Sequence, residues 1–430
     1  MATAENPIPS LVDVIVIGSG PGSATVAREL ARKGYSVAVL EWGSAAPLKG
    51  TLAQMAGIAA IPFKGMFIEP DASLLLRGIT AGGSSAINYA TAMPPPFDSF
   101  RRYGIELESH YSALQQDIPI QPLPDELIGP MASRLMHSAQ QLGLSWHKLD
   151  KMIAPELCRS GCWRCTYGCP FGAKWTARMF LDDAVAADAR LISNAKVSRV
   201  LIKEKRAIGV EFKHQGKIQQ INSDKVVLAA GGIGTPQILA ASGIKNVGRN
   251  FFVDPVVAVM GSIKDMQGGR EVPMATGLQL QGEGIMLADM TLPKPLFQGF
   301  ATQAGRVDRL FSHSSTLTLM VKIRDQLGGH FNQLGPVKSL TLQDKEKFKR
   351  GIFLARDILG NAGASSIFSS WHFAAHPGGT AKLGEIVDNK LQTEVDGLHV
   401  CDASVIPEEW GLPPTVTLLC LGKHLSEVMY

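Results

Sequence analysis

Four of the chain's six cysteines lie within twelve residues, in the segment CRSGCWRCTYGCP (158–170). Three, two and three residues separate them, and a proline follows the last one. Closely spaced cysteines closed by a proline are typical of iron-sulfur ligation, whereas zinc sites usually separate two close pairs by a longer loop. We therefore favour an iron-sulfur cluster (4Fe-4S or 3Fe-4S), and zinc, disulfides and free thiols stay open as alternatives. The candidate ligands are Cys158, Cys162, Cys165 and Cys169.

A glycine turn near the amino terminus is the second feature that could bind a reactive group. In VDVIVIGSGPGSATVARELARKGYSVAVLE (12–41), an apolar strand, a glycine turn, an amphipathic helix and a second strand follow one another. The free N–H groups at the start of such a helix bind a pyrophosphate, and an acid about 20 residues further on binds a ribose. The pattern predicts a dinucleotide site without separating NAD from FAD, and a turn that binds no phosphate is the alternative. The predicted contacts are Gly18, Gly20, Pro21, Gly22, Ser23 and Glu41.

Three further regions are distinctive: GITAGGSSAIN (78–88), AAGGIGTPQILAASGI (229–244) and the carboxyl-terminal pieces HPGGTAKLG (376–384) and GLHVCDASVIP (397–407). They resemble the signatures of the glucose-methanol-choline (GMC) oxidoreductase family. They follow the family's order, so the chain is identified as a member. The resemblance implies FAD and an α/β fold, in which a Rossmann-like domain with a doubly wound parallel sheet is joined by a smaller α+β substrate-binding domain.

The resemblance also places further side chains against the flavin. In the first region, glycines remove the Cβ and serines add hydroxyl groups, which suits a turn that hugs a flat or phosphorylated ligand. A plain Gly-Ser loop is the alternative there, and a helix cap is the alternative for Asp402. The predicted contacts are Gly82, Gly83, Ser84, Ser85, Asn88, Gly231, Asp402, Ala403, Pro414 and Thr415.

The family oxidises alcohols, a reaction that removes a hydroxyl proton and a hydride. FAD takes the hydride, so the protein has to supply a base, and histidine suits that task near neutral pH. Among ten histidines, His376 occupies the position of the family's catalytic histidine, but the second member of the family's pair falls on Pro413. We expect His372 as a substitute that shares a face with His376 only if the segment is helical. A packing or surface role is the alternative for His372.

The segment CPFGAKWTARMFLDDA (169–184) resembles a branch of the family with long-chain alcohol oxidases and sugar dehydrogenases. Some of those dehydrogenases carry an iron-sulfur cluster in this neighbourhood. The resemblance implies a dehydrogenase whose electrons pass through the cluster to an external carrier: a quinone, a cytochrome or an iron-sulfur protein. Two alternatives stay open. One is a non-catalytic electron-transfer flavoprotein with a degenerate active site, and the other is an O2-dependent alcohol oxidase with a structural cysteine site.

The signatures predict a discontinuous FAD-binding domain of residues 8–100, 185–255 and 375–430. Residues 101–184 form the predicted cysteine-rich segment, and residues 256–374 the predicted substrate-binding or cap domain. Within the latter, we expect LPKPLFQGF (292–300) to form an apolar loop. A partner subunit that completes the substrate pocket is left open. Cys401 and Cys420, in apolar surroundings, are predicted core residues.

Charge and hydropathy limit the remaining possibilities. Lys and Arg exceed Asp and Glu by only four, and no block of like charge occurs, which argues against nucleic acid as a partner. The first apolar run is too short to span a bilayer and leads directly into the glycine turn, unlike a signal peptide. We expect a cytoplasmic enzyme that oxidises a small-molecule alcohol, with peripheral membrane contact left open.

Overall fold

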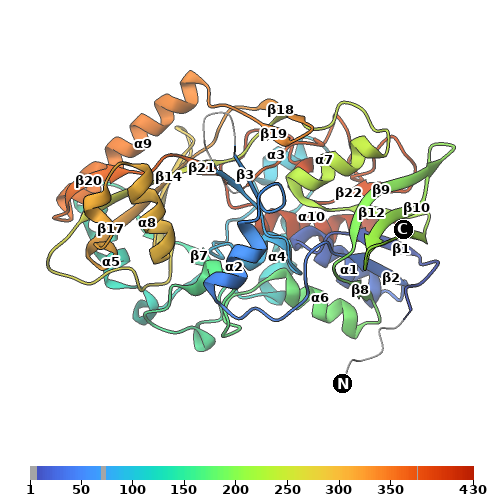
Figure 1. The fold of residues 1–430 in the computed structure, drawn as a ribbon, viewed down its shortest axis with the longest axis horizontal. Helices are drawn as coiled ribbons and strands as arrows, with labels where there is room; N and C mark the ends of the chain where they lie inside the picture. The colour runs from blue at the N-terminus through green and yellow to red at the C-terminus, as the bar shows by residue number, and fades with distance from the viewer. Residues whose placement is uncertain (1–6, 69–73, 375) are drawn as a thin grey trace.

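The computed structural model describes residues 7–68, 74–374 and 376–430. Two sheets dominate it, one in each half of the molecule (Figure 1). The predicted FAD-binding ranges include residues 69–73 and residue 375, which lie outside the described residues.

Five parallel strands form the first sheet, in the order β22, β12, β1, β2, β8. Their bounds are Val14–Ile17 for β1, Val37–Leu40 for β2, Arg190–Ile192 for β8, Val226–Leu228 for β12 and Leu398–Val400 for β22. Every residue of the four strands other than β8 is buried, as a parallel sheet covered on both faces requires. Because the strands are parallel, their carboxyl ends meet at one edge.

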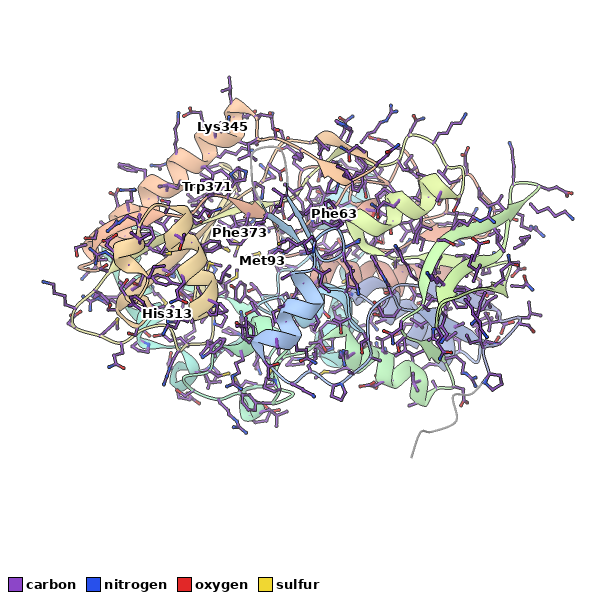
Figure 2. All side chains as sticks on the ribbon, viewed as in Figure 1. Phe63, Met93, His313, Lys345, Trp371 and Phe373 are labelled. Carbon is purple, nitrogen blue, oxygen red and sulfur yellow. The ribbon has the colours of Figure 1, made fainter. Side chains whose placement is uncertain are left out.

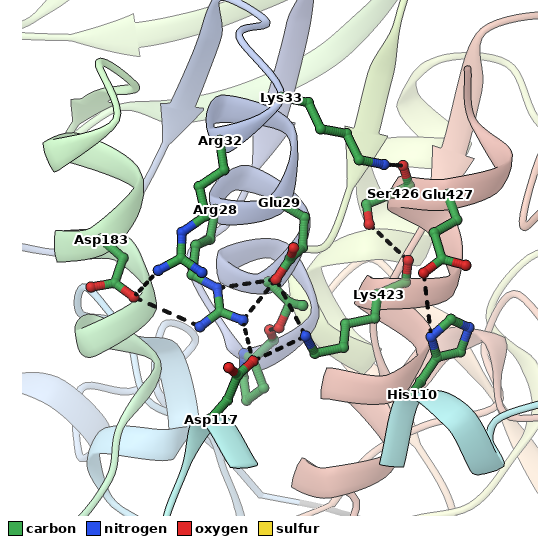
Figure 3. A network of polar contacts seen from close by, with 12 residues as sticks. Arg28, Glu29, Arg32, Lys33, His110, Asp117, Asp183, Lys423, Ser426 and Glu427 are labelled. Carbon is green, nitrogen blue, oxygen red and sulfur yellow. Dashed lines mark hydrogen bonds and ion pairs between the residues drawn. The ribbon is translucent and has the colours of Figure 1, made fainter. Parts of the chain in front are cut away.

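A cluster of charges holds the helices around this sheet (Figure 3). Arg28, buried on α1, forms ion pairs with Asp117 of α4 at 2.7 Å and with Asp183 of α6 at 3.7 Å. Lys423 of α10 also reaches Asp117, at 3.0 Å. The bounds are Pro21–Arg32 for α1, Glu108–Asp117 for α4, Ala177–Ala186 for α6 and Thr415–Val428 for α10. These contacts fix α1, whose first turn follows the glycine turn.

The second sheet has nine strands and is mainly antiparallel. Its order is β3, β4, β21, β14, β17, β16, β15, β6, and β20 also pairs with β14. The bounds are Met66–Ile68 (β3), Leu74–Leu76 (β4), His147–Lys148 (β6), Pro255–Ser262 (β14), Thr276–Leu280 (β15), Ile285–Asp289 (β16), Thr316–Ile323 (β17), Ser365–Ser369 (β20) and Phe373–Ala374 (β21). Together the two sheets confirm the predicted α/β fold class.

Alternating residues of β14 and β17 pack on opposite faces of the second sheet. Val257 and Leu319 join a core with helices α5 (Pro130–Gln141) and α9 (Leu342–Asn361). Val256 and Met320 join a separate core with helix α8 (Lys294–Gln303). This alternation follows from the two-residue repeat of a strand, and it determines which side chains face the cavity described below.

The remaining elements connect and cover the two sheets. The strands are β5 (Gln121–Pro122), β7 (Asp150–Lys151), β9 (Lys196–Lys203), β10 (Arg206–His214), β11 (Lys217–Asn222), β13 (Arg249–Phe251), β18 (Gly328–Asn332) and β19 (Gly335–Val337). The helices are α2 (Leu52–Ala59), α3 (Phe97–Arg101) and α7 (Gly231–Ala241). In the part of the chain described, no helix is both long and apolar enough to cross a membrane.

The expected loop at residues 292–300 is wrong, because most of this segment belongs to α8. Pro295 is the second residue of the helix, where proline is tolerated because the first turn has no intrahelical acceptor for its N–H groups. Pro293 stands just before the helix as its N-cap. The prolines therefore mark a helix start.

Candidate active site

A cavity of about 1210 Å³ takes its lining from both sheets. At the edge of the parallel sheet it is lined by Gly18 after β1, Glu41 after β2, Gly231 after β12 and Asp402 after β22. Parallel strands end at the same edge, which is why segments so far apart in the sequence meet there. Every predicted FAD contact except Gly82 lines this cavity.

The glycine turn is shaped to receive a phosphate group. A Cβ on Gly18 would lie 2.2 Å from the carbonyl oxygen of Ala229, so only glycine lets the turn approach β12 this closely. A Cβ on Gly20 would meet nothing within 4 Å, so space is open beside the start of α1. The Gly20 N-cap has no side-chain capping bond, and the first turn of α1 has no acidic residue. The unpaired N–H groups and open space therefore fit the pyrophosphate of FAD.

Ser19, which the sequence reasoning missed, links two of the predicted flavin-binding segments. Its hydroxyl group donates a hydrogen bond to Glu41 Oε2 at 2.5 Å and accepts one from the Gly82 N–H at 3.0 Å. Gly82 therefore does not line the cavity itself but supports Ser19, which does, through this hydrogen bond. Burial raises the pKa of Glu41 above its usual range. A serine between two turn glycines is the signal that could have identified this contact.

Asp402 braces the opposite side of the same edge. Its carboxylate accepts hydrogen bonds from the N–H of Gly231 at 2.8 Å, the hydroxyl of Thr235 at 2.5 Å and the N–H of Ser404 at 2.7 Å. The side chain therefore caps the turn after β22 and orients the start of α7, while the residue itself lines the cavity.

His376 stands on the cavity wall with 25% of its side chain exposed. Its Nδ1 lies 3.0 Å from Nζ of Lys322 and 3.3 Å from Oδ2 of Asp254, and these two partners form an ion pair at 2.9 Å. Both contacts use Nδ1, which leaves Nε2 available to the cavity. Burial, with a further contribution from Lys322, lowers the pKa of His376. This arrangement can present a neutral imidazole to a substrate.

Asp254 and Lys322 were not predicted from the sequence. Asp254 directly precedes β14, and its backbone φ of 51° is in the left-handed region. Lys322 lies on β17 and is the single charged residue of the buried run TLTLMVKI. A single lysine in a fully buried strand was the available signal, because such a charge requires a partner.

The structure separates the two histidines that the sequence placed four residues apart. Between them, Phe373–Ala374 form strand β21, so His372 and His376 do not share a helix face. The His372 ring lies 6.3 Å from that of Phe348 on α9, and His372 is not part of the cavity lining. Pro413, at the family's second position, does line the cavity.

The wall contributed by the second sheet is apolar and rich in methionine. Phe373, which appears near the centre of the molecule in Figure 2, belongs to it. Methionine side chains are flexible and adapt to irregular apolar ligands. The methionines of this wall are Met274, Met286, Met290 and Met320, and Met55 of α2 also lines the cavity.

The four clustered cysteines line one small cavity of their own. None of the six cysteines, all of which lie among the described residues, forms a disulfide. Cys401 and Cys420 are fully buried, which confirms them as core residues. Burial raises the pKa of Cys158 to about 11 and also raises that of Cys165. Among the described residues, no group of three or more His, Cys, Asp or Glu side chains is arranged to hold a metal ion.

Lys174 connects this cysteine loop to the predicted flavin-binding turn. Its buried ammonium group donates to the carbonyl oxygens of Cys165 at 2.8 Å, Ser85 at 3.0 Å and Ala86 at 2.9 Å. Lys174 also donates from its backbone N–H to the sulfur of Cys169, at 3.4 Å. Two residues that follow Cys165, Thr166 and Tyr167, line the large cavity. The loop and the large cavity are therefore adjacent.

A parallel sheet with a phosphate-binding turn, facing an antiparallel sheet with a histidine on the shared cavity, defines a dinucleotide-dependent oxidoreductase. The sequence pattern of GMC oxidoreductases matches residues 12–256 and again residues 342–422. The chain belongs to the GMC oxidoreductase family, whose members are FAD-dependent and act on CH–OH donors.

Curated relatives are distant but match along almost the whole chain. An uncharacterised GMC-type oxidoreductase of Mycobacterium tuberculosis is 27% identical, covering 99% of this chain and 77% of the relative. An uncharacterised protein of Methanocaldococcus jannaschii is 26% identical, covering 96% of this chain and 98% of the relative. A long-chain-alcohol oxidase of Arabidopsis thaliana is 24% identical, covering 97% of this chain and 67% of the relative.

Solved structures share the fold at low sequence identity. Pyridoxine 4-oxidase from Mesorbium loti superimposes with a TM-score of 0.76 at 16% identity, covering 97% of this chain and 98% of that one. A formate oxidase superimposes with a TM-score of 0.76 at 16% identity, covering 98% of both chains. These likenesses support the fold.

Proposed function

We propose that this protein is an FAD-dependent dehydrogenase that oxidises an apolar alcohol, with His376 as the proton acceptor. The observation that carries the proposal is the position of His376 on the same cavity as the phosphate-binding turn. Bound FAD supplies the hydride acceptor. The chain itself contributes Nε2 of a neutral imidazole, which takes the hydroxyl proton of the alcohol while the carbon–oxygen double bond forms.

The lining of the cavity supports an apolar substrate. Four methionines, Val256, Leu296 and Phe373 line the part of the cavity formed by the second sheet and α8, so a hydrocarbon chain would be buried there. The long-chain-alcohol oxidases among the relatives point to the same chemistry.

The cysteine loop supports an electron relay. We assign Cys158, Cys162, Cys165 and Cys169 as ligands of an iron-sulfur cluster, which when bound passes electrons singly to an external carrier. Three features favour it: the thiols share one cavity, the loop adjoins the large cavity, and the nearby Lys174 has no carboxylate partner among the described residues. One zinc ion would need thiolates about 2.3 Å from a common point, whereas a cluster of several ions holds them further apart.

Anaerobic mixing with alcohols tests the catalytic proposal. Short-chain, long-chain and polycyclic alcohols are added to the oxidised holoenzyme, and the flavin absorbance is followed. Bleaching by apolar alcohols, with little response to short polar ones, is the expected result. If no alcohol in the panel bleaches the flavin, the protein is better described as a non-catalytic electron-transfer flavoprotein. Rapid oxygen consumption during turnover would favour an oxidase.

Iron and acid-labile sulfide analysis of anaerobically purified protein tests the relay. We expect about four of each per chain, loss of iron in Cys162→Ser, and retention of iron in the control Cys420→Ala, a buried cysteine outside the loop. A flavin spectrum without iron, after attempted reconstitution, would return the loop to a structural role.

A further inference from the structure

The position that carries the second catalytic side chain in the family is occupied here by Pro413, which cannot form a side-chain hydrogen bond. A GMC enzyme that relies on His376 therefore needs another group to orient the ring and set its charge. The contacts of His376 show which group is available.

Lys322 reaches His376 from the second sheet. Within β17, Leu319, Val321 and Ile323 pack toward α5 and α9, so the alternate residues Met320 and Lys322 face the cavity. In the strand register, Lys322 lies between Val256 of β14 and Met286 of β16, and both of these neighbours line the cavity. Its ammonium group is thus embedded in an apolar wall and directed at the imidazole.

Asp254 contacts both Lys322 and His376 and holds them in place. Its Oδ2 contacts Nζ of Lys322 and Nδ1 of His376, while its Oδ1 accepts the N–H of Gly411 at 2.7 Å. Gly411 belongs to the segment that ends at Pro413. The carboxylate therefore ties Lys322, His376 and this segment together.

A second ion pair lies behind the first. Asp325 accepts the N–H of Asp254 at 2.9 Å and pairs with Lys338 at 2.8 Å. Among the described residues, the charged groups in this network around His376 are two lysines and two aspartates. Their charges balance without a proton on His376, so an imidazolium would add an uncompensated buried charge.

We propose that Lys322, held by Asp254, is the positioning residue that replaces the missing side chain at Pro413, orienting His376 with Nε2 toward the cavity and keeping its imidazole neutral. This inference rests on the proposed function of His376 as proton acceptor. For Nε2 to accept the alcohol proton, Nδ1 must carry the imidazole hydrogen and donate it to Oδ2 of Asp254. Lys322 then acts through Asp254, with which it forms an ion pair, and its charge beside the ring disfavours a second proton on the imidazole. The pKa of His376 is lowered by burial and by Lys322, and raised by Asp254.

The test compares Lys322→Met with Lys322→Arg. In anaerobic single-turnover reduction by a bleaching alcohol, the rate falls at low pH where His376 becomes protonated. Without the lysine cation, this fall should move to higher pH by about one unit, making Lys322→Met about tenfold slower than wild type on the acidic side. Above both pKa values, the rate should approach that of wild type. Lys322→Arg, which keeps the cation, should retain the wild-type profile.

Asp254→Asn is the control of opposite sign. Loss of the anion should lower the pKa of His376 and move the fall in rate to lower pH. A rate reduced equally at every pH in Lys322→Met, with an unshifted profile, would make Lys322 a purely structural residue and overturn the proposal.

A readout that requires no turnover separates this inference from the proposed function. In holoenzyme with ¹⁵N-labelled histidine, the ring signals of His376, assigned with His376→Gln, should titrate at higher pH in Lys322→Met than in wild type. Equal titration in the two proteins would contradict the role of Lys322. If flavin reduction were unchanged in His376→Ala, the assignment of His376 as proton acceptor would be wrong, even if the His376 ring titrated differently in Lys322→Met and wild type.

Discussion

Two buried lysines lie at the two proposed sites, Lys322 beside His376 and Lys174 beside the cysteine loop, and their partners differ. Lys322 pairs with the carboxylate of Asp254 beside His376. Lys174 donates only to carbonyl oxygens, and no carboxylate in the described chain forms an ion pair with it. Burial lowers the pKa of Lys174 to about 8. A buried cation without an anion is costly.

The difference indicates two kinds of site. The charges around His376 are balanced by two lysine–aspartate ion pairs of the protein itself, so this part of the cavity needs no charged ligand. The charge of Lys174 has no carboxylate among the described residues to balance it. The candidate anions are the thiolates of the cysteine loop, because Cys165 and Cys169 in their charged form raise the pKa of Lys174. The loop is therefore suited to hold an anionic group.

The largest effect is expected for Lys174→Met, which would disrupt the cysteine loop. The change removes a donor from five oxygens, namely the carbonyls of Ser85, Ala86, Asn88 and Cys165 and the side-chain oxygen of Asn88, and it removes the cation beside the cysteines. We expect a loss of about 4 kcal/mol in the free energy of unfolding, together with loss of iron from the purified protein. Lys345→Met, on the exposed face of α9, is the matched control. Unchanged stability and iron content would contradict the comparison.

Glu271→Gln tests the same contrast with a buried carboxyl group instead of a buried lysine. Glu271 is buried and accepts the N–H groups of Met131 and Ala132 at 2.7 and 3.1 Å. No lysine of the described residues forms an ion pair with it, and burial raises its pKa to about 7. The pKa of Asp254, beside Lys322, is instead lowered. The two carboxyl groups thus show what a paired cation changes.

The sign of the Glu271 effect follows from proton binding. Between the unfolded pKa near 4.3 and the folded pKa of about 7, only the folded state holds the proton, so stability falls as pH rises. Wild type should lose about 2 kcal/mol between pH 5 and pH 8 that the Gln variant does not lose. Unfolding measured at both pH values checks this, and equal losses in the two proteins would refute it.

Arg28→Met should have the smallest effect. Arg28 is also a buried cation, but its partners Glu29, Asp117 and Asp183 are partly exposed, and Lys423 stays close to two of them (Figure 3). We expect a loss of about 1.5 kcal/mol, with unchanged iron content and flavin reduction. A change in either chemical property would mean that buried cations act on the sites through the fold as a whole.

The sheet edge that lines the large cavity could be predicted because its signals are local. Gly18, Gly20 and Glu41 lie within one strand–turn–helix–strand unit, so spacing alone places them at the edge of a parallel sheet. The same applies to Asp402, which follows a short apolar strand.

The His376 environment could not be predicted, since long-range register creates it. Asp254 and Lys322 meet His376 only when β14 and β17 pair in an antiparallel sheet. His372 was chosen from sequence proximity, but its segment is not helical. The loop predicted at residues 292–300 failed for a local reason, because prolines at a helix start resemble those that bracket a loop.

The most direct test of the account is anaerobic single-turnover flavin reduction in His376→Ala, measured with an alcohol that bleaches the wild-type flavin. We expect FAD to stay bound at one per chain while flavin reduction slows at least about a hundredfold, the loss expected for a general base. Bound FAD and an unchanged rate of reduction would contradict it and remove His376 from the mechanism.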